Sequence, residues 1–324
     1  MKKIRLIDPW TAFILQHTNK PELLGELFED YLPDNGQSKV RCPIHGDTAA
    51  SLHIYPAGDA HCFGCRFHAD DLIELYSKLN GITYAEGQDT LYRRIVDIIP
   101  EENVFQFERN LVEAPWQWLT VERNISPSSI KQFHLGFDPL RQRVTIPIPD
   151  AFGYYRNIRY VAWVEEQVKH GKILNERGNG EVRLFPEPAL SLTNKVVLVE
   201  GELDCIVARQ YGIPAFTTTG GCGAWRPKFT EALKGKTVWM LYDNDEAGRK
   251  GAVEVAMKLL SVCAPLTTFK TEWCSSKLGK DITDWSFTCP KFLQSIADEV
   301  KQHKVERKKI EPRKQFCPTC GRPL

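Results

Sequence analysis

Short apolar runs alternate with amphipathic segments in the second half of the chain. The apolar runs span residues 196–199, 214–218, 237–242 and 266–269. The amphipathic segments begin near Glu202, Trp225 and Glu246. Apolar runs of four to six residues predict buried strands, and apolar positions spaced three and four apart predict helices. This alternation predicts an α/β domain in which helices cover a mainly parallel sheet.

The stretch from 111 to 190 has a different pattern. Apolar positions up to Phe133 predict a short helix, and the alternation within 135–148 predicts antiparallel strands, which together form a small α+β unit. Residues 101–116 carry charge without a clear period. We interpret them as a linker or frayed helix, with a domain boundary near residue 110.

Near the N-terminus, residues 51–55 and 60–63 predict two short strands that are joined by a turn at 56–59. A capping-box pattern at Asp71–Glu74 then starts a helix. Its apolar positions fall on one face. They are Leu72, Leu75, Tyr76 and Leu79.

This predicted ribbon carries two pairs of potential metal ligands. Each pair has two residues between its members, and the pairs are Cys42 with His45 and Cys62 with Cys65. Two such knuckles complete a tetrahedron of three thiolates and one imidazole, the donor set of a structural zinc site. The alternatives are incidental thiols, or ligation by nearby histidines. Those rivals are His53, His61 and His68.

The amino-acid composition is ordinary except for its cysteine content. The 324 residues are enough for two or three domains, and 42 Lys and Arg against 41 Asp and Glu give no overall attraction to nucleic acid. No apolar run is long enough to cross a membrane, and the first residues lack the pattern of a secretion signal. We therefore expect a cytoplasmic protein with no membrane contact. Its ten cysteines are then expected to be thiols or metal ligands.

Three carboxylates are expected at one edge of the predicted parallel sheet. Glu200 and Asp243 directly follow apolar runs, and Asp245 lies two residues further on. Ligands of such sheets bind at the carboxyl ends of the strands. Converging carboxylates require a neutralising cation, and hard oxygen donors favour Mg²⁺ or Mn²⁺. Taken alone, Asp243-Asn244-Asp245 is also a common turn and helix-cap sequence.

The N-terminal motifs carry a family resemblance. The run from Cys42 to Cys65, with its following helix and Gly81-Ile82-Thr83-Tyr84, resembles the zinc-binding domain of bacterial and phage DnaG-type primases. The resemblance covers about the first hundred residues. It implies contact with template DNA, with Lys39, Arg41 and the exposed ribbon aromatics as candidates.

The middle segment resembles the lead-in subdomain of the DnaG polymerase core. The matching motifs lie in residues 123–137, 143–153 and 172–185. Basic residues of that subdomain line the groove for template and nucleotide, which implies phosphate contacts for Arg143, Arg159 and Lys172. The alternative for each is a solvated ion-pair partner. The chain departs from the family at Pro186-Glu187, where a further basic residue is usual.

The acidic segment resembles the Toprim domain of primases, topoisomerases and some nucleases. The matching positions are Glu200-Gly201, Asp204, Gly220-Gly221 and Asp243 to Gly248. The resemblance implies that Glu200 is the acid/base or metal-binding residue and that Asp243 and Asp245 hold the ions. Asp204 is a further candidate ligand, as is Asp281 in a segment similar to one of primases.

Together these resemblances imply a magnesium- or manganese-dependent DNA primase. Such an enzyme makes short RNA primers from nucleoside triphosphates on single-stranded DNA by two-metal phosphoryl transfer. The implied parts are a zinc-binding domain, a subdomain of the polymerase core, a Toprim domain and a basic tail. They span 1–110, 111–190, 191–290 and 291–324. The chain ends where a helicase-interacting domain would begin in cellular primases, so we expect a compact mobile-element or phage form that works with any helicase in trans.

Two interpretations from other classes compete with this one. A non-catalytic DNA-binding clamp also combines a zinc site with a Toprim fold, and a Toprim nuclease uses the same carboxylates. More than a hundred residues with primase-like motifs separate the zinc motif from the Toprim motifs, which favours the primase.

The tail adds two open features. Residues 301–314 hold seven Lys or Arg against two Glu, suited to nonspecific phosphate contact or to a solvated charge run. Cys317 and Cys320 form a single knuckle. It could be completed by another chain or by a cysteine of this one, or it could bind nothing. The candidates in this chain are Cys263, Cys274 and Cys289.

Overall fold

The computed structural model describes residues 7–31, 38–260, 262, 266–268 and 279–302. The chain divides into two units, residues 1–100 and 101–324, which are treated separately below. Within the described residues, no helix is both long and apolar enough to span a membrane.

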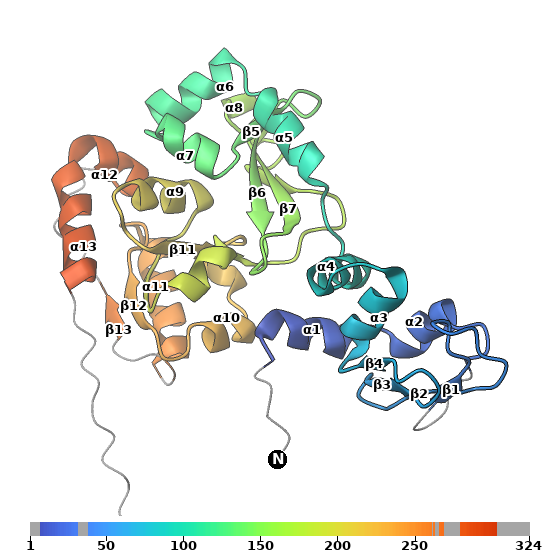
Figure 1. Cartoon of the computed structure of the whole chain (residues 1–324). Coiled ribbons are helices and arrows are strands. Elements are labelled where there is room, and N and C mark those ends of the chain that lie inside the picture. Colours follow the sequence, from blue (N-terminus) through green and yellow to red (C-terminus); the bar gives the residue numbers. More distant parts are fainter. Residues whose placement is uncertain (1–6, 32–37, 261, 263–265, 269–278, 303–324) are drawn as a thin grey trace, which may run out of the picture. The chain divides into compact units, whose positions relative to one another are not determined.

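The first unit is built around a four-stranded antiparallel sheet in the order β1-β2-β3-β4 (Figure 1). Its strands are β1 Ser38–Val40, β2 Leu52–Ile54, β3 Ala60–Cys62 and β4 His68–Ala69. Its helices are α1 Pro9–His17, α2 Lys20–Leu27, α3 Leu72–Asn80 and α4 Tyr84–Ile95. Side chains at alternate positions of β1, β2 and β3 are buried, as expected for a sheet with one face on a core.

Local sequence signals set the helix ends in this unit. Asp71 accepts a hydrogen bond from the Glu74 amide at 2.8 Å and so caps α3, as its sequence predicts. Gly81, in the left-handed conformation at φ 65°, ends that helix. Thr83 and Glu86 then form a complete capping box for α4. The ribbon and its covering helix are therefore specified by residues close in sequence.

The second unit contains two sheets. An antiparallel sheet has the order β5-β6-β7-β8, and a mostly parallel one has the order β13-β12-β10-β11-β9. The strands of the first are β5 Gly136–Asp138, β6 Arg143–Pro149, β7 Tyr155–Val161 and β8 Ile173–Asn175. The strands of the second are β9 Leu184–Phe185, β10 Lys195–Leu198, β11 Ala215–Thr218, β12 Thr237–Met240 and β13 Leu266–Thr268. Only β9 runs antiparallel, against β11.

Helices and helical turns connect these strands. The helices are α5 Glu101–Arg109, α6 Glu113–Gln117, α7 Pro127–Gln132, α8 Glu165–Val168, α9 Glu202–Gln210, α10 Pro227–Ala232, α11 Glu246–Leu259, α12 Ile282–Thr288 and α13 Pro290–Gln302. The turns of other helix types are η1 Trp118–Glu122, η2 Glu187–Leu192 and η3 Cys222–Ala224.

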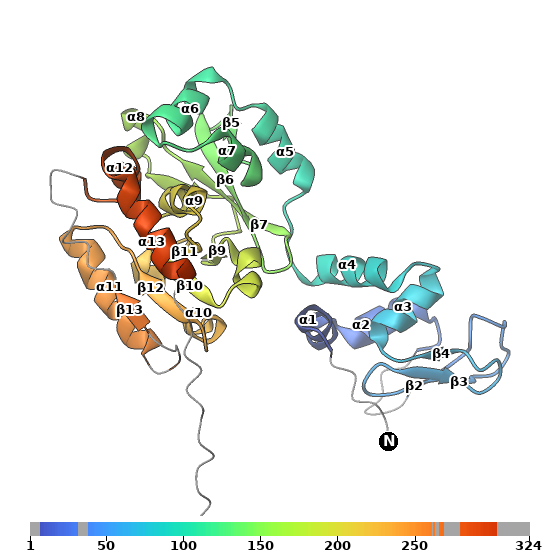
Figure 2. The same ribbon diagram turned by 60° about the vertical axis from the view of Figure 1, so that its left-hand side comes forward.

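Neighbouring residues of the parallel strands face opposite cores. Val197 and Trp239, paired in register, pack with residues of α9, α12 and α13. Val196 and Val238 pack on the other face with residues of α10 and α11. The sheet lies between these two sets of helices, which can be followed in Figures 1 and 2. Strands covered on both faces read as continuous apolar runs, which is why the sequence revealed them.

The boundary between the units lies ten residues earlier than the sequence suggested. The stretch interpreted as a linker or frayed helix contains α5, which belongs to the second unit. A Cβ atom on Gly136 would lie 2.4 Å from the carbonyl carbon of Phe107, so only glycine lets β5 approach α5 this closely. The α+β part and the α/β part also share one hydrophobic core, with Ile146 and Val197 among its members. The predicted class, α/β and α+β with an N-terminal ribbon, is confirmed.

Candidate zinc site and candidate acidic active site

The four predicted zinc ligands come together at one end of the ribbon. Their ligand atoms all lie within 4.8 Å of one another, and no other group of His, Cys, Asp and Glu among the described residues comes as close. The Cys42 and Cys65 sulfurs are 3.8 Å apart, and Cys62 Sγ lies 3.9 Å from His45 Nδ1. A tetrahedron with zinc–sulfur bonds of about 2.3 Å places its sulfurs about 3.8 Å apart. The donor set and its spacing therefore fit zinc.

Two further contacts shape this cluster. His45 Nδ1 faces Cys62, and its other ring nitrogen lies 3.2 Å from Asp47 Oδ1. A carboxylate on the outer nitrogen orients a metal-binding imidazole. A Cβ atom on Gly64 would lie 2.7 Å from His45 Nε2, so a larger residue at this position would displace the imidazole ring. The rival histidines are absent from the cluster.

The cysteine thiols differ in their ease of ionisation. Burial opposes ionisation of Cys62, but hydrogen bonds from Ser51 and from the Cys65 and Gly64 amides lower the pKa of its thiol to about 6. Burial, together with the neighbouring thiols, raises the pKa of Cys42 to about 12. A thiolate at Cys62 is thus favoured without metal, while a thiolate at Cys42 needs a cation to stabilise it.

The solvent face of the ribbon carries a row of basic and aromatic side chains. Lys39, His53, His61 and His68 are direct partners across the four strands. The Phe63 side chain, which is 64% exposed, packs edge-on against His53 and His61 with ring centroids 4.7 and 4.8 Å away. We call this set the ribbon row. Another predicted DNA contact, Arg41, pairs with Asp30 at 3.2 Å.

In the second unit, two predicted catalytic carboxylates follow neighbouring parallel strands. Glu200 comes after β10 and Asp243 after β12, at the carboxyl edge of the sheet. A Cβ atom on Gly248 would lie 2.2 Å from Asp243 O and 2.8 Å from Glu200 Oε1. The start of α11 therefore packs against both residues, and only glycine fits there. Asp245 caps this helix by accepting the Gly248 amide at 2.8 Å.

We call Glu200, Asp243 and Asp245 the acidic group, and its electrostatics favour a cation. Burial first, then Asp204 and Glu200, raises the pKa of Asp243 to about 7. Burial, then Asp245 and Asp204, raises the pKa of Glu200. The Gly248 amide is the main reason that the pKa of Asp245 is lowered. One Glu200 oxygen, Oε1, is buried and has no hydrogen-bond partner. Such an orphaned acceptor among carboxylates fits a divalent metal.

The two further candidate ligands are partly engaged. Asp204 Oδ1 accepts hydrogen bonds from Thr283 N at 3.3 Å and Thr283 Oγ1 at 2.9 Å. Burial, then Asp281, raises the pKa of Asp204 to about 6. Asp281 caps α12 by accepting the Asp284 amide at 2.8 Å. Asp204 thus holds the first turn of α12 through Thr283, and Asp281 caps that helix. Both carboxylates also lie close enough to Asp243 to raise its pKa.

Among the described residues, no three of these carboxylates come as close together as the four ligand atoms of the Cys/His cluster do. Magnesium usually takes one or two protein carboxylates and completes its shell with water and substrate phosphates. A magnesium site of this kind does not require all of its carboxylates to meet at one point.

The three basic residues expected to bind phosphate differ in availability. The Arg143 side chain is buried, and its guanidinium donates to the Gly171 and Gln167 carbonyls at 2.8 and 3.0 Å. Because these N–H groups already donate to backbone carbonyls, the expected phosphate contact of Arg143 is not supported. Arg159 donates to Glu202 at 2.9 Å in a largely buried pair. Lys172 is exposed.

Sequence reasoning missed Lys280. Its Nζ atom lies 3.6 Å from Asp243 Oδ2 and 3.6 Å from Asp245 Oδ2. Burial lowers its pKa, but the carboxylates of Asp243, Asp245 and Asp281 outweigh burial and raise it overall. The segment around Asp281 resembles one of primases, and the lysine beside Asp281 was the available signal.

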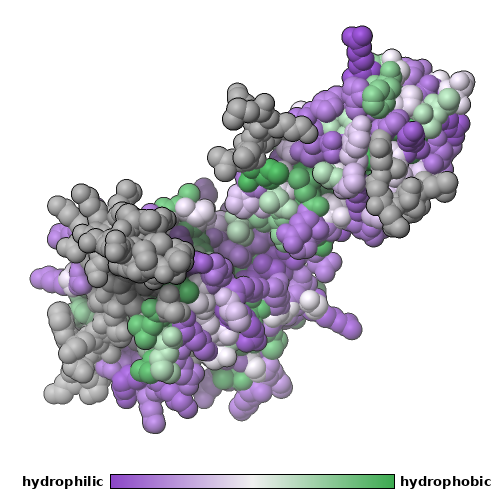
Figure 3. Space-filling model, turned by 90° about the horizontal axis from the view of Figure 1, so that it is seen from below, coloured by the Kyte–Doolittle hydropathy of each residue, from purple (hydrophilic) through white to green (hydrophobic). Residues whose placement is uncertain are grey.

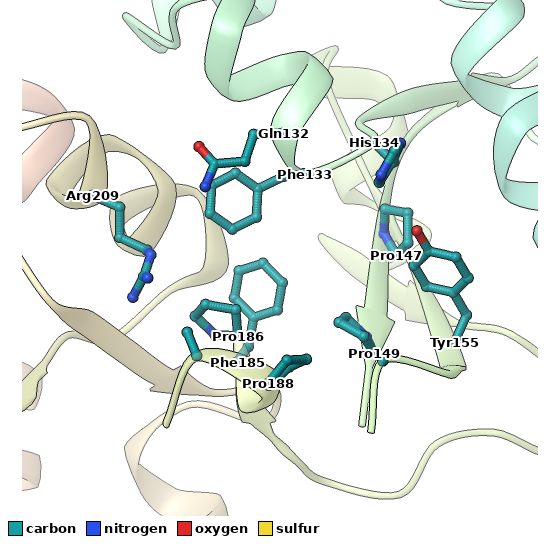
Figure 4. Close-up of a pocket in the computed structure, with 12 residues that line it drawn as sticks. Gln132, Phe133, His134, Pro147, Pro149, Tyr155, Phe185, Pro186, Pro188 and Arg209 are labelled. Carbon is teal, nitrogen blue, oxygen red and sulfur yellow. The ribbon is translucent and has the colours of Figure 1, made fainter. Parts of the chain in front are cut away.

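A separate pocket of 290 Å³ lies elsewhere in this unit. Phe133, Phe185 and Pro147 surround it, with Arg209 at one side (Figure 4). Arg209 is near the end of α9, whereas the acidic group adjoins the start of that helix, so this pocket is separate from the acidic group.

On the face drawn in Figure 3, hydrophobic residues form small separate patches among hydrophilic ones.

Cys263, Cys274, Cys317 and Cys320 lie outside the described residues, as do residues 303–314 of the basic stretch. Cys289 is described and is a free thiol.

Comparisons with known proteins agree with the motifs. Residues 197–284 match the Toprim-like family. The DNA primase of Chlamydia pneumoniae is 24% identical over 286 residues, which cover 67% of this chain and 48% of that protein. The DNA primase of Lactococcus lactis is 23% identical over 293 residues, 69% of this chain and 45% of that protein. The chain thus spans about half the length of the curated relatives it matches.

Among solved structures, the zinc-binding and RNA polymerase domains of the Aquifex aeolicus primase are similar, with 20% identity, a TM-score of 0.49, and coverage of 90% of this chain and 86% of that one. The Toprim domain and the resemblance to DNA primases are confirmed by the family match and the curated relatives.

Proposed function

We propose that this chain is a DNA primase that synthesises short RNA primers from nucleoside triphosphates on single-stranded DNA. The observation that carries the catalytic part is the acidic group. The buried, unpartnered Glu200 Oε1 lies beside Asp243, whose pKa is raised to about 7, within a match to the Toprim-like family. The relatives named DNA primase support this activity over the others that use the same carboxylates.

In this proposal Glu200, Asp243 and Asp245 hold divalent cations, with Asp204 and Asp281 as further ligands. Bound Mg²⁺ or Mn²⁺ would supply the Lewis acidity that activates a 3′-hydroxyl and stabilises the leaving pyrophosphate. The protein itself contributes position. The Gly248 amide fixes the Asp245 carboxylate, and the fit of Gly248 keeps Glu200 next to Asp243. No covalent nucleophile is required.

The zinc-binding unit would contact the template through the ribbon row. An exposed aromatic ring provides a stacking surface for a base, and nearby cations attract the backbone phosphates. Phe63 supplies the ring and Lys39 the permanent charge. Lys172 and Arg159 remain proposed contacts for phosphate in the second unit, and Lys172 is the more accessible of the two.

The clamp and nuclease alternatives are distinguished in one reaction. The purified chain is incubated with end-labelled single-stranded DNA, labelled ribonucleotides and Mg²⁺ or Mn²⁺. The proposal predicts short RNA products and intact DNA. Shortened DNA without RNA products indicates a nuclease, and bound but unchanged DNA without RNA products indicates a clamp. Either of those results contradicts the proposal.

A further inference from the structure

The backbone of Lys280 is held against the acidic group. Its carbonyl oxygen accepts a hydrogen bond from the Asn244 amide at 2.7 Å, and its own amide donates to Asp284 Oδ2 at 2.9 Å. Asn244 lies between the two proposed metal ligands Asp243 and Asp245. The residue is therefore tied to the segment that carries those ligands, although 36 positions separate Lys280 from Asn244 in the sequence.

The turn before α12 is also anchored to the core. The Gly279 carbonyl accepts a hydrogen bond from the fully buried Trp285 indole at 3.1 Å. Gly279 has φ of 101°, and a Cβ atom there would lie 2.1 Å from Asp284 Cβ, so the turn needs glycine. The position of the Lys280 backbone is thus fixed by several contacts.

The side chain of Lys280 has more freedom than its backbone. It is 59% exposed, whereas the Asp243 side chain is only 17% exposed. Its ammonium group lies 3.6 Å from one oxygen of Asp243 and 3.6 Å from one oxygen of Asp245. A cation on a flexible stem that stands between two carboxylates can neutralise them and can also swing into solvent.

We propose that Lys280 is the resident counter-ion of the acidic group and competes with divalent cations for Asp243 and Asp245. This inference rests on the proposed function, because it assumes that these carboxylates bind metal. The ammonium reduces carboxylate repulsion while no metal is bound. A bound divalent cation displaces it toward solvent, where it is available to the phosphates of a nucleotide. Lys280 is thus a positioning residue that lowers the affinity of the site for metal.

The test is direct binding of Mn²⁺ to the full zinc-loaded chain without DNA or nucleotide, with free Mn²⁺ followed by electron paramagnetic resonance. Lys280→Met keeps the length of the side chain and removes its charge, and Lys280→Gln is a second neutral variant. Lys280→Arg keeps the charge. Lys258→Met is the matched control, because Lys258 is an exposed lysine near the far end of α11.

Both neutral variants are expected to bind Mn²⁺ about twofold to tenfold more tightly, the range given by one or two exposed ion pairs. The arginine variant and the Lys258 control should bind as the unmodified chain does. Unchanged or weaker binding by both neutral variants overturns the inference and leaves the metal site intact. If the unmodified chain binds no more Mn²⁺ than Asp243→Asn, the proposed metal site itself fails, and the inference fails with it.

Discussion

Thr283 donates two hydrogen bonds to one carboxylate oxygen of Asp204, from its backbone N–H at 3.3 Å and from its hydroxyl at 2.9 Å. These residues lie 79 positions apart in the chain. Asp204 lies in the first turn of α9, which begins just after Glu200, and Thr283 lies at the start of α12, which begins just after Asp281. The pair therefore links the two helices at these ends. Asp204 is therefore a structural link between the two acidic segments, whichever ions it also binds.

Replacing Thr283 with valine should destabilise this link. Valine keeps the shape and the backbone bond but removes the hydroxyl, so we expect a loss of about 2 kcal/mol in the free energy of unfolding, typical of a hydrogen bond to a charged group. Urea unfolding measures the change. Thr283→Ser keeps the hydroxyl and should lose only about 1 kcal/mol, for the buried methyl group. A valine variant as stable as the unmodified chain would show that the hydroxyl contributes nothing.

Gly248→Ala should disrupt the acidic group. The added Cβ would overlap with Asp243 O and approach Glu200 Oε1. Relief of the overlap requires a backbone shift that costs about 1–3 kcal/mol and should also weaken Mn²⁺ binding. Thermal unfolding and Mn²⁺ titration measure the two effects.

Gly25→Ala is the control for that substitution. Gly25 lies within helix α2 and has no atom within 4 Å of its added Cβ. Alanine there should leave stability unchanged or raise it by up to about 1 kcal/mol, because alanine favours a helix. Equal effects of the two substitutions would contradict the assigned role of Gly248.

Cys62→Ser should remove the zinc. Burial opposes ionisation of the Cys62 thiol, but hydrogen bonds lower its pKa to about 6, which favours the thiolate that binds metal, and serine is a poor zinc ligand. Metal analysis should show about one zinc fewer per chain, and residues 40–80 should become sensitive to protease. Cys289→Ser, a change of a free thiol outside the cluster, should keep its zinc. Unchanged metal content in Cys62→Ser would refute the ligand assignment.

Phe63→Ala should weaken binding to single-stranded DNA without unfolding the ribbon, since the side chain is 64% exposed. Loss of one stacked base corresponds to about 1–3 kcal/mol, or roughly fivefold to 150-fold in Kd. Fluorescence anisotropy with a labelled oligonucleotide measures it. Ile44→Ala, an exposed apolar side chain at the other knuckle, is the comparison. A wild-type Kd for Phe63→Ala would remove the ribbon row from the template interface.

Local signals explain why much of the fold could be predicted. The parallel strands are covered on both faces and so appear as apolar runs, and Asp71 and Asp245 begin their helices by capping them. The boundary at residue 100 was missed because α5 joins the second unit through a tertiary contact. That contact depends on the missing side chain of Gly136, and one glycine gives no sign of its distant neighbour.

The candidate sites were predictable to different degrees. The cysteine and histidine spacing predicted the four residues that form the candidate metal cluster, because short knuckles determine which side chains meet. Arg143 was misjudged because an arginine that donates to backbone carbonyls looks the same in sequence as one that binds phosphate. Lys280 was missed because its contact with Asp243 and Asp245 depends on the packing of α12.

The most direct test of the central proposal is template-directed RNA synthesis by the full chain. Labelled ribonucleotides are supplied with Mg²⁺ on single-stranded DNA templates of different sequence, beside an Asp243→Asn variant shown to be folded. The account predicts short RNA products whose sequence follows the template, and none from the variant. Products of the same sequence on every template, or equal synthesis by Asp243→Asn, would contradict it.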